Sequence, residues 1–338
     1  MRVRIVCAVA LFALFLFPFC GRAAELKAIE PLLSPSTRLM VFSPHPDDET
    51  LGAGGLMQRV LEAGGKVKVV FMTSGDGYLE GVELEDHTAH PTASEYDKYG
   101  QIRRHEALRA LATLGVKPHN VIFLGFPDGG LSDLLLKTCV HKDPYRSPFT
   151  LKNRPPKFEL ILPRTDYCAH DLSGEIERVI FRFRPTLVVT TGPQDLHPDH
   201  KTTYHFVKEA LNRLGRKFPR LKPVFLTFVI HFDGWPVNQE ASSGARLDPP
   251  EGFPVPPTKW ITFNLKPAEV NGKREAIEKY HSQMKLLNRF MLCFAKSDEL
   301  FLQDPDSPAQ GGAPLRLSKK EPGLGSDASK PAPGRNQF

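Results

Sequence analysis

Two short polar segments of the chain contain the residue types that bind metal ions and move protons. The first, residues 43–49, reads SPHPDDE, and the second, residues 195–200, reads DLHPDH. Each segment follows an apolar run that has the composition of a buried strand. Carboxylates and imidazoles are unfavourable at such a place unless they are paired or hold a cation. We therefore interpret the two segments as the two halves of a divalent-metal site.

The spacing of the histidines indicates which residues hold the ion. His45 and Asp48 are three residues apart in the first segment, and His197 and His200 are three residues apart in the second. A catalytic zinc ion takes three protein ligands from histidine and carboxylate side chains and leaves a fourth position for water. Two histidines and one aspartate satisfy this requirement. The residues alone do not decide whether His197 or His200 is the second histidine ligand.

The side chains that remain have the chemistry of a hydrolase. A metal ion lowers the pKa of its bound water to about 7, and a base must then take the proton. Asp47 lies beside the expected ligands and is the expected base, while a protonated His197 would stabilise an oxyanion. Asp199 is placed to hold one nitrogen of His197. We expect Zn2+ as the cofactor, although the same donors accept Fe2+, manganese or cobalt.

Each segment also has a purely structural interpretation. The acidic run at residues 47–49 could stabilise the positive end of a helix dipole, and the histidines of the second segment could be surface residues at a helix start. Their joint occurrence after two strands favours the metal site. The glycine-rich residues 52–55 lack the spacing of a dinucleotide-binding loop and follow an acidic turn that repels a pyrophosphate, so no dinucleotide is expected.

Strands that alternate with helices must position these segments. Apolar runs predict strands at 38–43, 66–73, 121–124, 186–190 and 224–232, and helices at 49–63, 101–114 and 172–183, with a fourth helix that follows a turn at 195–200 and runs to 214. Polar residues 78–99 are expected to form a surface loop, and the proline-containing residues 131–170 an irregular excursion. A further edge strand at 260–265 precedes a helix at 268–290. This order predicts an α/β fold: a three-layer, Rossmann-like arrangement with a mainly parallel sheet and helices on both faces.

The two ends of the chain differ from this domain. Residues 1–23 combine early arginines, the apolar run Ile5–Phe19 and small residues before a cleavage point after Ala23, as in a secretory signal peptide. An uncleaved membrane anchor is the alternative. Residues 24–304 are expected to form the domain, and the proline- and glycine-rich residues 305–338 a disordered tail. We expect an exported protein, periplasmic or secreted, without stable membrane insertion after cleavage.

Charge and cysteine content restrict the partners. The formal net charge is +6, and it falls to +3 without residues 1–23, which carry three arginines and no acidic residue. Because no long basic cluster with interleaved aromatic residues remains, nucleic acid is not an expected partner. Cys139, Cys168 and Cys293 are widely spaced, so at most one disulfide bond can form among them.

The sequence PHPDDE at residues 44–49, together with HPDH at 197–200, resembles the paired signature of the PIG-L/LmbE-like superfamily of zinc-dependent N-acetylglucosamine deacetylases. The similarity extends from about Arg38 to Asp233. A weaker similarity at 273–301 includes YHSQ at 280–283. The resemblance implies zinc ligation by His45, Asp48 and His200, a general base at Asp47, and an oxyanion-stabilising acid at His197 that is oriented by Asp199.

The same resemblance implies two substrate-binding residues. Arg103 matches an arginine that contacts substrate, and Asp128 matches an acidic residue that binds sugar hydroxyls. Structural alternatives are an ion pair between Arg103 and a neighbouring acid, and an ordinary turn role for Asp128. The chain also departs from the pattern, because some members place a mobile tyrosine where this chain has Asp195. This departure puts the substrate of those members in doubt and leaves the metal chemistry intact.

We therefore expect an exported zinc hydrolase that removes the acetyl group from an N-acetylglucosamine-type amino sugar or glycoconjugate. Its partner would be a small-molecule or glycan substrate with an N-acetyl group. One alternative keeps the metal site and hydrolyses another amide or an ester. The other is a non-catalytic carbohydrate-binding protein on the same fold, which would have no need for Asp47 and Asp199.

Overall fold

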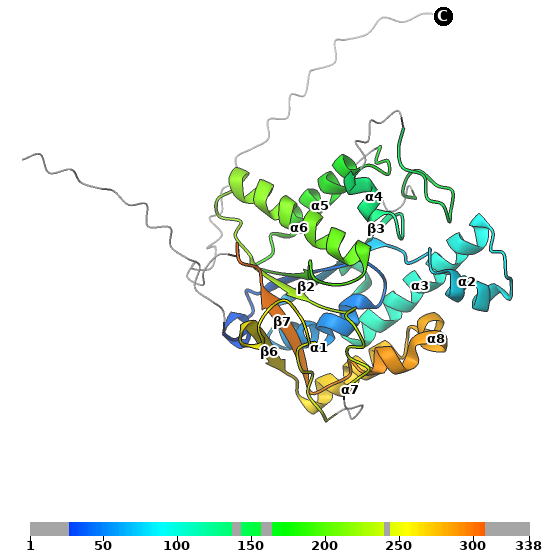
Figure 1. Ribbon diagram of the computed structural model, residues 1–338. Helices are drawn as coiled ribbons and strands as arrows, with labels where there is room; N and C mark the ends of the chain where they lie inside the picture. Colours follow the sequence, from blue (N-terminus) through cyan, green and yellow to red (C-terminus); the bar gives the residue numbers. More distant parts are fainter. Residues whose placement is uncertain (1–26, 137–142, 157–163, 240–243, 308–338) are drawn as a thin grey trace, which may run out of the picture.

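The computed structural model describes residues 27–136, 143–156, 164–239 and 244–307 (Figure 1). The expected signal peptide, Cys139 and the expected tail from residue 308 onward lie outside the described residues. The described part of the chain forms one seven-stranded sheet with helices packed around it. Among the described residues, no helix has the length and apolar character needed to cross a membrane.

The sheet has the strand order β3-β2-β1-β4-β5-β7-β6. Its strands are β1 (Arg38–Ser43), β2 (Lys66–Thr73), β3 (Val121–Phe126), β4 (Leu187–Thr191), β5 (Val224–Phe228), β6 (Trp260–Asn264) and β7 (Asp298–Gln303). The first five strands are parallel, whereas β7 runs antiparallel to both of its neighbours, β5 and β6. The mainly parallel sheet is therefore confirmed, and β6 is the edge strand.

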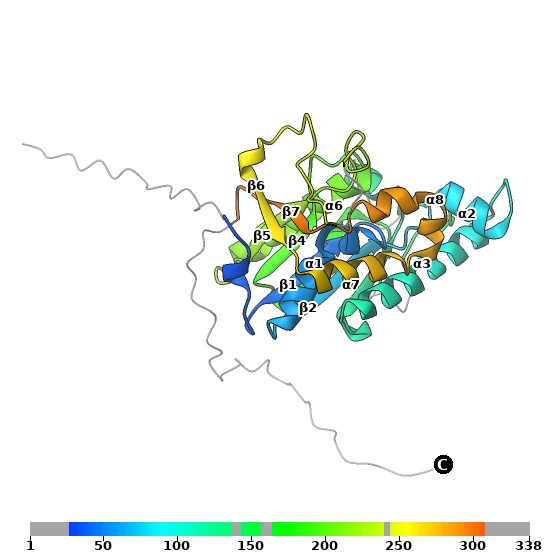
Figure 2. The ribbon, with the colours of Figure 1, turned by 90° about the horizontal axis from the view of Figure 1, so that it is seen from below.

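Helices cover both faces of the sheet. They are α1 (Asp48–Glu62), α2 (Leu79–Asp86), α3 (Ala93–Thr113), α4 (Leu131–Leu136), α5 (Ala169–Phe183), α6 (Pro198–Lys217), α7 (Pro267–Ile277) and α8 (His281–Leu292). Figure 1 shows α4, α5 and α6 above the sheet, and Figure 2 shows α1, α3 and α7 on the opposite face. These three layers confirm the Rossmann-like architecture that the sequence predicts.

The side chains of β1 show why the sequence of this strand is apolar throughout. Leu39 and Val41 belong to the core on the side of α1 and α3, whereas Met40 and Phe42 belong to the core on the side of α5 and α6. Successive side chains of a strand point to opposite faces, and here both faces are covered. A continuous apolar run is the result.

The order of the strands determines where a ligand can be held. β1 and β4 lie side by side in parallel, with Leu39 opposite Leu187 and Val41 opposite Val189. The strand order reverses between them, because β2 and β3 extend to one side and β5 to the other. Ligands of open α/β sheets bind at such a switch point, outside the carboxyl ends of the strands. Both polar segments of the sequence leave the sheet there.

Several elements differ from the expectations. The strand expected at 224–232 ends at Phe228, and residues 131–136 form α4. Residues 78–99 contain α2 and the first turns of α3 instead of a loop, and the helix expected at 268–290 is two helices, α7 and α8. β7 was not predicted, because its Asp298 and Glu299 are fully buried acids in a strand. Their partners are distant: Leu247 N–H and Arg246 bind Asp298, and α1 backbone N–H groups bind Glu299.

The ordered domain extends past the expected boundary at residue 304. Ser307 is buried, and its Oγ accepts a hydrogen bond of 2.8 Å from the backbone N–H of Phe225 in β5. Asp304 N–H also donates to the carbonyl of Phe225. The described chain therefore stays attached to the sheet through Ser307.

Candidate metal centre and active site

Three ligand atoms from the two polar segments form a nearly equilateral triangle. Asp48 Oδ2 lies 3.2 Å from His45 Nδ1 and 3.2 Å from His200 Nε2, and the two nitrogens are 3.3 Å apart. A tetrahedral zinc ion, with ligands about 2.0–2.1 Å away, requires its ligand atoms to be about 3.3 Å from one another. The triangle therefore fits a metal ion with three protein ligands and one open position.

The geometry also bears on the choice between His197 and His200. A nitrogen of His197 lies within 4.8 Å of ligand atoms of His45 and His200, so its ring borders the same centre. However, His197 Nδ1 accepts a hydrogen bond of 3.2 Å from the backbone N–H of Asp199. His200 is the histidine that makes the 3.2 Å contact with Asp48. His200 is thus the histidine in direct contact with Asp48, and its role as the ligand stays a prediction.

A sharp strand-to-helix turn holds the first half of the site. Ser43 Oγ donates to the carbonyl of His45, and the backbone N–H of His45 donates to Asp48 Oδ2 at 3.0 Å. Asp47, the residue before α1, has φ 129° and ψ −37°, a conformation that is strained for any residue except glycine. Strain of this kind persists only where neighbouring contacts hold it, as at active sites.

A second carboxylate lies beside each of the two expected histidine ligands. Asp195 Oδ2 lies 3.2 Å from His200 Nδ1, and Asp128 Oδ1 lies 3.0 Å from His45 Nε2. In each ring, the other nitrogen points to the triangle. Carboxylates in this position select the tautomer and fix the ring plane of a metal-binding histidine. Asp195, which stands where some family members have tyrosine, thus has a clear structural role that the sequence did not reveal.

The carboxylates around His200 raise the pKa of its ring. Burial alone would lower its pKa, but Asp195 and Asp48 outweigh burial and raise the pKa to about 9. Burial would raise the pKa of Asp195, whereas the charge and hydrogen bond of His200 lower it below its usual value. Metal ligation requires neutral imidazole, so binding of an ion at this site releases a proton.

The Asp128 carboxylate is buried and already has protein partners, unlike a carboxylate that is open to sugar hydroxyls. Besides its contact with His45, it accepts a hydrogen bond of 2.6 Å from the backbone N–H of Gly77, and its side chain is buried. Burial raises its pKa, but the charge of His45 and its hydrogen bond, together with the charge of Arg103, lower the pKa well below the usual value. Asp128 therefore orients His45, and contact with substrate hydroxyls stays a prediction.

Arg103 pairs with the expected base. Its Nη2 donates to Asp47 Oδ2 at 3.0 Å and to the carbonyl of Pro46 at 2.8 Å, and its Nη1 donates to the carbonyl of Gly75 at 2.9 Å. Only 4% of Arg103 is exposed. These contacts correspond to the structural alternative, an ion pair with a neighbouring acid, and its contact with substrate stays a prediction. The buried guanidinium holds the Asp47 carboxylate beside the ligand triangle.

The environment of Asp47 suits proton transfer near neutral pH. Burial raises its pKa to about 7, while the positive charge of Arg103 opposes the rise and the negative charge of Asp48 adds to it. A general base is most effective when its pKa lies near the working pH. The role of Asp47 as the base stays a prediction.

The expected contact between the Asp199 carboxylate and His197 is not formed. Asp199 instead accepts hydrogen bonds from the backbone N–H groups of Gly129 at 2.8 Å and Leu131 at 3.1 Å. Two residues of separation along the chain could not show which way this carboxylate turns. It binds the donors at the start of α4, and only its backbone N–H contacts His197.

His197 is also not held in its protonated form. Burial and the positive charges of His45 and His200 lower its pKa to about 3. Because Nδ1 accepts a backbone hydrogen bond, the proton of the neutral ring lies on Nε2. His197 can therefore act as a neutral hydrogen-bond donor.

Comparison with known proteins identifies the family. A family model described as PIG-L, GlcNAc-PI de-N-acetylase, matches residues 40–211, just over half of the chain. The chain belongs to the PIG-L family. The match contains both polar segments of the metal centre.

Curated relatives of this PIG-L protein carry the name 1D-myo-inositol 2-acetamido-2-deoxy-alpha-D-glucopyranoside deacetylase. The protein of Mycobacterium sp. (strain KMS) is 31% identical over 198 residues, which are 56% of this chain and 55% of the relative. That of Rhodococcus opacus (strain B4) is 28% identical over 228 residues, 65% of this chain and 69% of the relative. The chain thus spans little more than half the length of the first of these relatives.

Solved structures show the same fold. The zinc-inhibited form of teicoplanin deacetylase is 22% identical and superimposes with a TM-score of 0.50, covering 80% of this chain and 100% of that chain. A triple mutant of a deacetylase from the teicoplanin biosynthetic pathway is 20% identical, with the same TM-score and coverage. At these identities the likeness extends to the fold alone.

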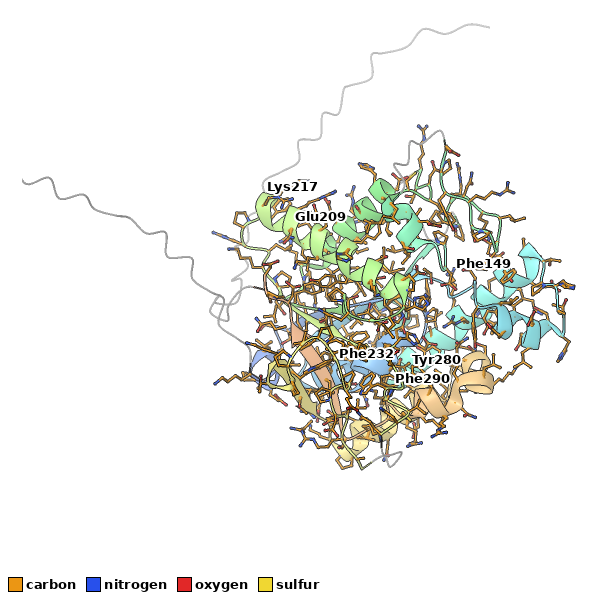
Figure 3. The ribbon with its side chains drawn as sticks, in the orientation of Figure 1. Phe149, Glu209, Lys217, Phe232, Tyr280 and Phe290 are labelled. Carbon is orange, nitrogen blue, oxygen red and sulfur yellow. The ribbon has the colours of Figure 1, made fainter. Side chains whose placement is uncertain are left out.

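Part of the centre lies outside the residues that match the PIG-L model. Glu49 is fully buried and accepts hydrogen bonds from the backbone N–H of Asp47 at 3.1 Å and from the hydroxyl of Tyr280 at the start of α8. Burial raises the pKa of Glu49. Figure 3 labels Tyr280 and Phe290, which come from opposite ends of α8. The C-terminal part of the chain thus helps to hold Asp47 in its strained conformation.

His231 is a site residue that the sequence offered only as a minor candidate for pocket lining at a strand end, without a catalytic or metal-binding role. It follows β5, and its ring centroid lies 5.0 Å from that of His200 and 5.6 Å from that of His197. Its other face stacks on Phe290, with 5.4 Å between centroids and 5° between planes. Burial and the charge of His200 lower its pKa to about 4. The one available signal was its position at the end of an apolar run, which many structural histidines share.

Proposed function

We propose that this protein is a divalent-metal-dependent N-deacetylase that removes the acetyl group from an N-acetylglucosamine-type amino sugar or glycoconjugate. The observation that carries the proposal is the ligand triangle of His45, Asp48 and His200 with the Asp47 carboxylate beside it. Membership of the PIG-L family and the names of the curated relatives support the same reaction.

A bound divalent ion would supply Lewis acidity and water with a pKa near 7. Asp47 accepts the proton of the attacking water, with Arg103 keeping its carboxylate in place. His197 donates its Nε2–H to the oxyanion that develops on the acetamide carbonyl. Protonated Asp47 then returns the proton to the amine nitrogen as the C–N bond breaks. The products are acetate and the free amino sugar.

Zinc is the ion that we propose. Two imidazole nitrogens and one carboxylate oxygen at tetrahedral spacing are typical of catalytic zinc sites. The same donors also suit Fe2+, manganese and cobalt, so affinity alone does not select the ion. Metal analysis of the purified protein tests this part of the proposal separately from the reaction.

We further propose that the protein is exported. The support is the signal-like sequence of residues 1–23 and the disulfide bond of Cys168, since disulfides persist mainly in oxidising compartments. Cys293 is a free, buried thiol, as expected when at most one bridge forms. N-terminal sequencing of protein recovered from each cell fraction would test this. Recovery of the full-length chain from the cytoplasm alone would contradict it.

The decisive experiment measures acetate release from a panel of N-acetylated amino sugars, with and without a chelator. Asp47→Asn should retain metal and lose about 10²–10⁴-fold in turnover, because proton transfer contributes about that much. His45→Ala should lose the metal itself. Asp248→Asn, a matched change at an exposed aspartate, should leave both unchanged.

Three results would overturn the proposal. Turnover by Asp47→Asn at the wild-type rate would show that Asp47 is not the base. Turnover that persists in the presence of a chelator would show that the reaction needs no metal ion. Faster release of acetate from O-acetyl esters than from acetamides would assign the site to ester hydrolysis instead.

A further inference from the structure

The ends of α5 and α6 present two exposed aromatic rings on the surface. Phe181 and Phe218 are 36% and 42% exposed, and their ring centroids are 4.8 Å apart. The guanidinium carbon of Arg184 lies 5.7 Å from the centre of the Phe181 ring. Large apolar side chains of soluble domains are usually covered, so a tilted pair of rings in contact with solvent is a candidate interaction surface.

The helix ends that carry this pair, and the residues that follow them, are rich in basic side chains. We define the basic-aromatic patch as Phe181 and Phe218 together with Arg182, Arg184, Arg213, Arg216, Lys217, Arg220 and Lys222. The carboxylates paired with these cations are Glu177, 3.6 Å from Arg213 and 3.8 Å from Lys217, and Glu209, 2.8 Å from Arg213 and 3.8 Å from Arg216. Seven basic residues against these two carboxylates leave the patch a surplus of five positive charges. The formal charge of the whole chain without residues 1–23 is +3, so the rest of that chain carries a net negative charge.

The patch lies at the edge of the sheet opposite the metal centre. α6 begins beside His197 and is 20 residues long, which carries Lys217 about 30 Å from the site. Figure 3 shows Lys217 and Glu209 along α6, well away from Tyr280 and Phe290. The chain also enters β1 at this edge, where Arg38 donates to the carbonyl of Phe183. The apolar run at residues 5–19 precedes this point in the sequence.

We propose that the basic-aromatic patch docks this protein on an anionic lipid bilayer. Phenylalanine rings enter the boundary between headgroups and acyl chains, while arginine and lysine side chains reach the lipid phosphates. Charge complementarity identifies an anionic partner, and the paired rings favour a surface into which they can insert together. Single-stranded nucleic acid, by contrast, stacks successive bases on separate aromatic platforms. In this orientation the metal centre faces away from the bilayer and stays accessible.

The test is co-sedimentation of the exported protein, soluble without detergent, with vesicles of phosphatidylcholine alone or with 30% phosphatidylglycerol. Wild type should bind only the anionic vesicles. Arg216→Glu with Lys217→Glu should weaken binding by about 30-fold, since each basic residue contributes about fivefold. Phe181→Ser with Phe218→Ser, which leaves the charge unchanged, should weaken binding by about tenfold. Far-UV circular dichroism checks that each variant is folded.

The matched control is Lys285→Glu with Arg289→Glu, an equal charge change at exposed residues of α8, the helix whose Phe290 stacks on His231 beside the metal centre and which is therefore remote from the patch. It should change binding by less than about twofold. An equal loss in the control would show diffuse attraction and overturn the proposal. So would absence of binding at 0.1 M salt, or tighter binding of wild type to a soluble polyanion, such as single-stranded DNA, than to the vesicles. None of these results depends on whether the protein is a deacetylase.

Discussion

Replacement of Asp195 by asparagine tests the least expected feature of the metal centre. The carboxylate is fully buried, and its Oδ2 faces His200 Nδ1 at 3.2 Å and accepts from the backbone N–H groups of Ile230 and His231 at 2.8 and 3.0 Å. Its Oδ1 accepts from the backbone N–H of His197 at 2.9 Å. Asparagine has the same shape, but only one of its two terminal atoms can accept. At least one buried donor must then lose its partner.

Two effects determine the size of the change. Loss of the carboxylate behind a metal-binding histidine typically lowers metal affinity by about 10–100-fold. A buried donor without an acceptor destabilises the fold by about 1–3 kcal/mol. Asp195→Asn should therefore bind zinc about 10–100-fold more weakly than wild type. The free energy of unfolding of the metal-free variant should be about 1–3 kcal/mol lower than that of the metal-free wild type.

Zinc affinity would be measured by competition with a chromogenic chelator, and stability by urea denaturation of the metal-free protein. Asp248→Asn, at an exposed aspartate, serves as the control and should match wild type in both measurements. Zinc affinity of Asp195→Asn within twofold of wild type would refute the reasoning. If stability fell while affinity did not, Asp195 would support the turn after β5 without orienting His200.

Three further changes probe the contacts that hold the centre. Tyr280→Phe removes the hydroxyl that donates to buried Glu49, and it should lower the free energy of unfolding by about 1.5–3 kcal/mol in a denaturation experiment; an unchanged midpoint would contradict this. Gly75→Ala would place a Cβ 2.1 Å from Arg103 Nη1 at a φ of +65°. It should lower the free energy of unfolding by more than about 1 kcal/mol and, because Arg103 must move away from Asp47, reduce acetate release. Turnover at the wild-type rate would show that the contact between Arg103 and Asp47 is dispensable. Lys273→Met leaves the buried Glu299 carboxylate without its 2.8 Å partner and should lower the free energy of unfolding by about 3–5 kcal/mol. Lys117→Met, at an exposed lysine, should leave it unchanged, and equal stabilities of the two variants would argue against a buried ion pair.

The sequence alone predicts the framework well. Two strands, residues 38–43 and 66–73, begin and end where their apolar runs do. Both faces of these strands are covered, so burial leaves a continuous pattern that local reading can detect. The approach of His45 and Asp48 to His200 follows in the same way, since the ends of neighbouring parallel strands meet at one edge of the sheet.

Other features depend on contacts that no local pattern reports. β7 has buried acids, so its sequence does not look like a core strand until the donors of α1 are in place. The residues beyond 131 that were expected to lack regular structure contain α4, whose first N–H groups turn the Asp199 carboxylate away from His197. The hydrogen bond from Tyr280 to Glu49 joins residues 231 positions apart in the sequence.

The sequence by itself thus determined the layers of the fold, the two halves of the metal site and the residue types available to it. Tertiary structure decided which partner each buried polar side chain has: Asp195 for His200, Asp128 for His45, and Arg103 for Asp47. The physical reason is that the spacing of apolar residues within a short segment already shows which faces of a strand or helix are buried. The direction of a buried carboxylate depends instead on donors that distant elements bring to it.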